Sequence, residues 1–192
     1  AAKQGADGIE LDVHVTKDGE VVVTHDEKID RVSNGSGFIK DMTLRELKRL
    51  SFHNHMESYV GAGIPTLREV LEYVSTTNMD VNIELKTGIY WYPQIEEKTA
   101  FIVQETGMHD RVIYSSFNHH SIAKIKEIDS TAETAWLFSD VILNVEQYAK
   151  ANGVEGLHPA VKPVNNVVQL DLFPDYEKME RERREGACMD CK

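Results

Sequence analysis

The chain has 192 residues, enough for one sizeable domain, with 41% hydrophobic and 28% charged residues, as is typical of a globular protein. The net charge of -11 disfavours nucleic acid as a ligand, because a phosphate backbone is bound by a basic surface. No apolar run is long enough to cross a bilayer. We therefore expect no stable membrane insertion, and we favour a cytoplasmic location.

The first predicted strand, residues 8–13 (GIELDV), carries two acids among apolar residues. Side chains alternate along a strand, so Glu10 and Asp12 share one face while the apolar residues take the other. Two neighbouring carboxylates repel each other unless a cation lies between them, and hard divalent cations prefer carboxylate oxygens. The strand therefore indicates a metal site. The alternative is an exposed edge with two solvated acids.

Residues 16–26 predict a β-hairpin, because an Asp-Gly turn signal separates two β-rich runs. A two-residue turn would pair Val15 with Val22 and place Asp12 opposite His25. A three-residue loop would shift this pairing by one residue. In both registers His25 returns to the acidic pair, where an imidazole can act as general acid or base near neutral pH.

Two capping boxes predict helix starts at residues 43–46 and 66–69, both with the sequence TLRE. Strands and helices then alternate, with strands at 81–86, 112–117, 134–138 and 154–158 and helices at 94–105, 121–128 and 144–151. This alternation implies an α/β fold with a parallel sheet, as a barrel or a doubly wound sheet. No glycine-rich phosphate loop follows any strand, which disfavours nucleotide binding.

The carboxyl ends of parallel strands meet on one face of such a fold. There Glu84 and Lys86, which share a strand face, would join Glu10, Asp12 and His25. Three carboxylates suit Ca²⁺ or Mg²⁺, and a lysine beside them suits a phosphate. The set indicates metal-assisted phosphoryl chemistry.

A series of motifs, in this order, resembles the glycerophosphodiester phosphodiesterase family. They are residues 5–13 (GADGIELDV), 22–26 (VVTHD), 82–86 (NIELK), 115–117 (SSF) and 156–159 (GLHP). The resemblance covers about residues 1–162 and implies a (β/α)8 TIM barrel of the phospholipase C-like phosphodiesterase type. It also implies roles for seven residues: metal ligands Glu10, Asp12 and Glu84, one of two catalytic histidines His25, a phosphate contact Lys86, and groove residues Phe117 and His158.

The resemblance implies hydrolysis of a small phosphodiester, such as glycerophosphocholine, to glycerol 3-phosphate and an alcohol. The family's first strand, ending in His-Arg, and its late tryptophan-bearing strand have no counterpart here. We therefore expect a partial barrel over residues 1–162, lacking the first and the last strands and inactive alone, and a divergent charged tail over 163–192. Two alternatives remain: a non-catalytic barrel remnant that binds metal or phosphoester, and a related phospholipase-like phosphodiesterase.

Overall fold

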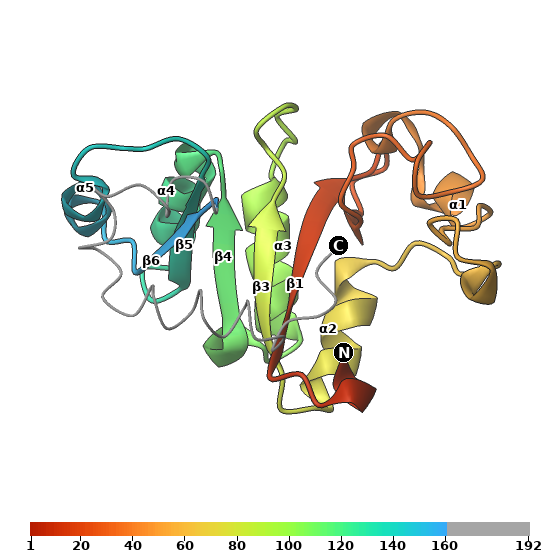
Figure 1. The fold of residues 1–192 in the computed structure, drawn as a ribbon, viewed down its shortest axis with the longest axis horizontal. Helices are drawn as coiled ribbons and strands as arrows, with labels where there is room; N and C mark the ends of the chain where they lie inside the picture. The colour runs from red at the N-terminus through yellow and green to blue at the C-terminus, as the bar shows by residue number, and fades with distance from the viewer. Residues whose placement is uncertain (161–192) are drawn as a thin grey trace, which may run out of the picture.

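The computed structural model describes residues 1–160. The charged tail expected from residue 163 onward, with both cysteines, lies outside the described residues. Six strands form one sheet in the order β2-β1-β3-β4-β5-β6 (Figure 1). The strands are β1 (Gly8–Val15), β2 (Val21–Val23), β3 (Asp80–Leu85), β4 (Val112–Ser116), β5 (Glu133–Phe138) and β6 (Gly156–Pro159). Strand β2 is antiparallel to β1. The other five strands, β1, β3, β4, β5 and β6, are parallel to one another, so the predicted parallel sheet is confirmed.

The strands alternate with helices, two of which start as the capping boxes predict. The α-helices are α1 (Leu44–Leu47), α2 (Leu67–Ser75), α3 (Ile95–Glu105), α4 (His119–Ile128) and α5 (Val145–Ala151). Short 3-10 turns occur at Ala2–Gln4, Ile39–Asp41, Glu57–Tyr59 and His109–Arg111. At α1 and α2, the hydroxyls of Thr43 and Thr66 accept hydrogen bonds from the backbone three residues later, and the glutamates there accept in return. Each exchange satisfies amides that a helix start leaves free.

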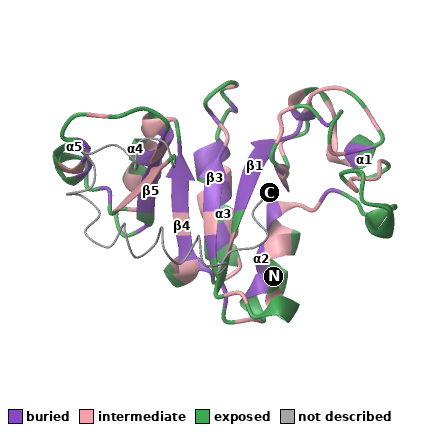
Figure 2. Cartoon of the chain, viewed as in Figure 1, coloured by how far each residue is buried: buried purple, intermediate pink, exposed green. Residues whose placement is uncertain are grey.

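The main core lies between one face of the sheet and the helices. Leu11, Ile83 and Leu85 of the strands are buried together with Leu71 of α2 and Ile122 of α4. Figure 1 shows α3 and α4 behind the sheet, and Figure 2 shows the central strands as largely buried. Because strand residues alternate, the acids of β1 and β3 lie on the face that these helices leave open.

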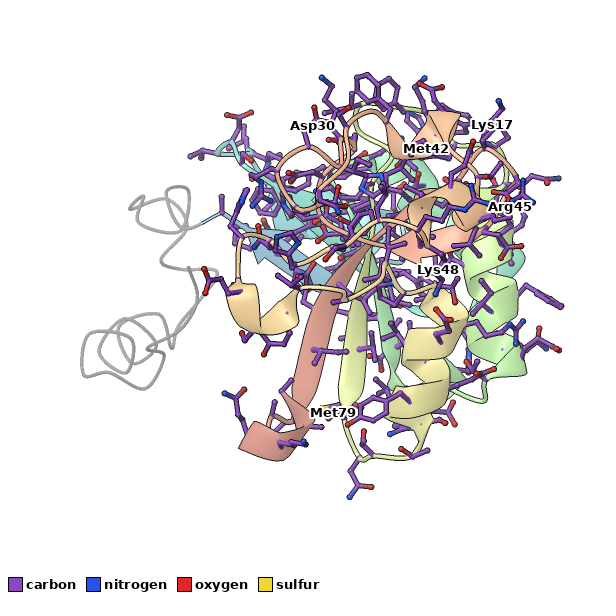
Figure 3. All side chains as sticks on the ribbon, turned by 90° about the vertical axis from the view of Figure 1, so that its right-hand side faces the viewer. Lys17, Asp30, Met42, Arg45, Lys48 and Met79 are labelled. Carbon is purple, nitrogen blue, oxygen red and sulfur yellow. The ribbon has the colours of Figure 1, made fainter. Side chains whose placement is uncertain are left out.

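Residues 24–66 form a long excursion beside β1 at the carboxyl end of the parallel strands (Figure 1). Figure 3 shows Asp30 and Met42 of this segment at that end and Met79 at the opposite end, just before β3. A second buried cluster supports the segment, formed by Val22, Ile29, Ile39, Leu47 and Ile64. Residues 24–66 therefore pack around a small core of their own and lie beside the carboxyl end of the parallel strands.

The hairpin between β1 and β2 has the longer of the two predicted loops. Val15 pairs with Val21, so the two-residue turn with its Val15–Val22 pairing is wrong and the register shifted by one is confirmed. The Asp18 carboxylate explains the shift, since it accepts hydrogen bonds from the Thr16 hydroxyl and, across the structure, from the Leu44 amide of α1. Gly19 completes the loop with φ 88°, a conformation that glycine adopts readily.

Candidate metal and phosphate site

Parallel pairing of β1 with β3 brings three carboxylates together. Asp12 lies directly opposite Glu84, and Glu10 lies one step earlier on the same face, opposite Asn82. One oxygen from each of Glu10, Asp12 and Glu84 lies within 4.8 Å of the other two. Asp12 and Glu84 are buried, whereas Glu10 is exposed. The three acids that the sequence predicts as metal ligands therefore form one cluster.

The closeness of the three acids disfavours their negative charge, which shows in the pKa values of two of them. Although Glu10 as a whole is exposed, partial burial of its carboxylate, followed by repulsion from Asp12 and Glu84, raises the pKa of Glu10. Burial also raises the pKa of Glu84, with a further contribution from Asp12, against the opposing effect of Lys86. Neighbouring carboxylates with raised pKa values are stabilised when a cation is placed among them.

Within residues 1–160, Lys86 is the residue that forms ion pairs with these acids. Its Nζ lies 3.0 Å from Glu84 Oε1 and 3.4 Å from Asp12 Oδ1. Burial disfavours the charge, but the two carboxylates outweigh burial and raise the pKa of Lys86. The ammonium group therefore stays protonated beside the acids, where it can contact an anionic substrate.

Further oxygen atoms line the same face. Asn82 Oδ1 and Ser115 Oγ are buried and make no hydrogen bond within the described residues. Asn82 pairs with Glu10 and Ser115 pairs with Glu84, so both neighbour the acidic cluster. A buried polar atom without a partner is costly. Three carboxylates with neutral oxygens nearby form a donor set that fits Ca²⁺ or Mg²⁺.

His25 follows β2 and is oriented by its neighbour in the chain. Its Nδ1 lies 2.7 Å from Asp26 Oδ1, and because a carboxylate accepts, Nδ1 carries the hydrogen and Nε2 remains available. Arg31 donates to both oxygens of Asp26, at 2.7 and 2.9 Å. These bonds, those from Arg31 foremost, lower the pKa of Asp26 to about 2. The amide of Thr24, the residue before His25, donates to the carbonyl oxygen of Asp12 at 3.1 Å, so the chain brings His25 to the strand that carries the acids.

The sequence of residues 1–183 matches the profile of the Glycerophosphoryl diester phosphodiesterase family. The chain belongs to this family. It is 44% identical over 160 residues to a glycerophosphodiester phosphodiesterase of Caldanaerobacter subterraneus subsp. tengcongensis, covering 83% of this chain and 66% of the relative. It is also 44% identical over 164 residues to one of Bacillus altitudinis, covering 84% and 67%. The chain thus spans about two thirds of the length of these relatives.

Solved structures of family members share the fold. A phosphodiesterase of Oleispira antarctica, solved with the product sn-glycerol 3-phosphate, superimposes with a TM-score of 0.76 at 26% identity, covering 97% of this chain and 72% of that one. A glycerophosphodiester phosphodiesterase of Thermotoga maritima gives 0.68 at 25% identity, covering 93% and 71%. The fold is therefore that of the TIM-barrel phosphodiesterases, and residues 1–160 supply five parallel strands of such a barrel, with the antiparallel β2 at the edge of the sheet. Within that range no helix has the length and apolar character needed to span a membrane.

The two expected groove residues lie at different distances from the cluster of Glu10, Asp12 and Glu84. Phe117, after β4, lines a cavity together with Glu84 and Lys86. His158 lies on β6, three strands beyond β3, so roughly 14 Å of sheet separates it from the acids. The pKa of His158 is lowered by burial. The structure thus groups Phe117 with the acids and leaves His158 on a more distant wall.

Sequence reasoning missed the residues that hold His25 in place. His14, on the same face of β1 as Glu10 and Asp12, is fully buried, and its Nε2 lies 3.2 Å from the carbonyl oxygen of His25. Its Nδ1 lies 3.0 Å from the hydroxyl of Tyr92 in the loop after β3. Glu10, Asp12 and His14 are each two residues apart. The strand alternation that places the two acids on one face therefore also indicates that His14 lies on that face. Nothing local in the sequence indicates the contact with Tyr92.

Proposed function

We propose that this protein hydrolyses glycerophosphodiesters to sn-glycerol 3-phosphate and an alcohol, as part of glycerophospholipid breakdown. The observation that carries the proposal is the cluster of Glu10, Asp12 and Glu84, whose oxygens lie within 4.8 Å of one another. The 44% identity to two glycerophosphodiester phosphodiesterases and the product bound in the Oleispira antarctica structure support it.

We assign the three acids to a divalent metal ion, Ca²⁺ or Mg²⁺. When bound, such an ion polarises a phosphoryl oxygen and stabilises the charge that develops on it. Binding of the substrate is assigned to side chains of the protein. Lys86 would contact a phosphate oxygen, because its ammonium lies beside the acids and stays charged. Phe117 and, farther across the sheet, His158 would line the groove for the substrate.

We assign His25 to proton transfer. Asp26 accepts the hydrogen of Nδ1, so Nε2 is the atom that takes or gives a proton. The guanidinium of Arg31 donates to both oxygens of the Asp26 carboxylate, which orients the acceptor of the imidazole. Such a histidine can protonate a leaving alkoxide or remove a proton from an attacking hydroxyl group.

The test is production of glycerol 3-phosphate from glycerophosphocholine by the purified full-length parent protein, before and after removal of divalent ions with a chelator; the 192-residue chain assayed alone is expected to be inactive. We expect Glu84→Gln to abolish turnover, because the substitution keeps the side-chain shape and removes one ligand charge. Glu57→Gln, in the exposed 3-10 turn of the 24–66 segment, is the matched control and should retain wild-type turnover. Undiminished turnover of the Glu84→Gln protein would refute the metal assignment.

A further inference from the structure

A small cavity opens beside the proposed phosphate contact. It has a volume of about 260 Å³, with Glu84 and Lys86 at one side and Glu27, Ile89 and Phe117 among its other walls. This is below the roughly 300 to 1,000 Å³ of sites that enclose drug-sized ligands. The cavity therefore suits one small substituent of the phosphate better than an acyl chain.

Glu27 brings a negative charge to this cavity that the surrounding chain does not neutralise. Its side chain is half-buried, and within residues 1–160 it takes part in no ion pair or side-chain hydrogen bond. Lys86, the cation among the lining residues of this cavity, is paired with Glu84. A carboxylate that is partly removed from water and lacks a partner favours a cationic ligand.

The other walls are apolar and accessible. Phe117 is 49% exposed and Ile89 is 70% exposed, although both are large hydrophobic side chains that burial would favour. The face of an aromatic ring attracts cations, and quaternary ammonium groups are recognised in this way. A carboxylate, an aromatic ring and an aliphatic side chain around one cavity together form a recognition set for an alkylated ammonium group.

We propose that the cavity between Glu27 and Phe117 binds the cationic end of the alcohol esterified to the phosphate, as in choline or ethanolamine diesters. The inference rests on the proposed phosphodiesterase function, because Lys86 beside the cavity would hold the phosphate that carries this alcohol. It assigns Glu27 to selection of the substrate, separate from the acids that would hold the metal ion.

In the full-length parent protein, the experiment compares kcat/KM for a cationic diester, glycerophosphocholine, with that for a neutral one, glycerophosphoglycerol. Glu27→Gln should lower kcat/KM for the choline diester about tenfold, the loss expected when one close charge contact to a cation is removed. It should leave the glycerol diester within about twofold, since that contact is absent there. Glu57→Gln should change neither substrate. Equal effects of Glu27→Gln on both diesters, or no effect on either, would overturn the proposal.

A third substrate, lysophosphatidylcholine, presents the same cation on a lipid and identifies the source of the ligand. Turnover of glycerophosphocholine alone indicates a soluble diester, and turnover of lysophosphatidylcholine alone indicates a lipid headgroup. A selective effect of Glu27→Gln on whichever choline diester is turned over supports the cavity assignment.

A binding measurement separates failure of the inference from failure of the proposed function. If the full-length parent protein hydrolyses no diester, the proposed function fails, and tetramethylammonium then probes the cavity without chemistry. We expect this ion to shift the NMR signals of the Phe117 ring in the wild-type protein and not in Glu27→Gln. The absence of a shift in the wild-type protein would overturn the cation site.

Discussion

The imidazole of His14 joins the backbone of His25 to the hydroxyl of Tyr92. Its Nε2 must donate, because the carbonyl oxygen of His25 can only accept at 3.2 Å. Its Nδ1 then accepts from the Tyr92 hydroxyl at 3.0 Å. Burial raises the pKa of Tyr92 and lowers that of His14, so the hydroxyl keeps its hydrogen and the imidazole stays neutral. The loop after β3 thus supports the residue proposed for proton transfer.

We expect His14→Leu to lower kcat for glycerophosphocholine about ten- to hundredfold, because a displaced acid or base loses most of its effect. The KM should change little, since the acids and Lys86 keep their places. His14→Gln should restore much of the turnover, because its side-chain amide can both donate to the His25 carbonyl and accept from the Tyr92 hydroxyl. An equal loss of kcat in both variants would contradict a positioning role for His14. A loss of kcat that is proportional to the fraction of unfolded protein would contradict it as well.

The ion pair of Asp26 with Arg31 predicts a stability change at low pH. The pKa of Asp26 falls to about 2 in the folded protein, mainly through the hydrogen bonds from Arg31, from an ordinary value of 3.8. The contribution of this depressed pKa is therefore present above pH 3.8 and is lost as the pH falls through about 2. In urea unfolding, wild type and Asp26→Asn should differ most above pH 4 and converge below pH 2, roughly the limits of this window. A difference independent of pH would contradict the assignment.

Metal binding should stabilise the folded chain. A ligand that binds only the folded state adds about 2.7 kcal/mol at a concentration one hundred times its dissociation constant. We expect Ca²⁺ or Mg²⁺ to raise the melting temperature of the wild-type protein and to have little effect on Glu84→Gln. Calorimetry should show one ion per chain. An identical shift in both proteins would indicate ion binding elsewhere.

The capping box of α2 gives a prediction that is independent of function. The Thr66 hydroxyl accepts from the Glu69 amide at 3.2 Å, and the Glu69 carboxylate accepts from the Thr66 amide at 2.8 Å. Thr66→Ala should lower the free energy of unfolding by about 1 kcal/mol, and Thr66→Ser should cost less because it keeps the hydroxyl. Chemical denaturation measures both. Equal losses would show that the methyl group, rather than the cap, matters.

Local patterns in the sequence determined much of the fold. The alternation in residues 8–13 predicted β1 and placed Glu10 and Asp12 on one face. The two threonine caps predicted the starts of α1 and α2, because capping depends on residues three positions apart. The start of α4 at His119, two residues earlier than predicted, follows from Asn118, whose side chain accepts from the His120 amide.

The hairpin shows where local reasoning ends. The turn signal fixed that β1 and β2 pair, but the loop length depended on a hydrogen bond between Asp18 and Leu44 of α1. The sequence therefore left two registers open, and a contact with a distant segment decided between them. A one-residue difference in register changes which side chains lie opposite each other.

The sequence by itself determined which side chains are available for chemistry and on which strand faces they lie. Only the tertiary structure decided that Asp12 lies opposite Glu84, that Tyr92 contacts His14 78 residues away, and that Glu27 faces the cavity beside Lys86. The physical reason is that strand periodicity and helix caps are interactions of near neighbours. Contacts between distant segments depend on how whole elements pack, which the pattern of any single segment does not contain.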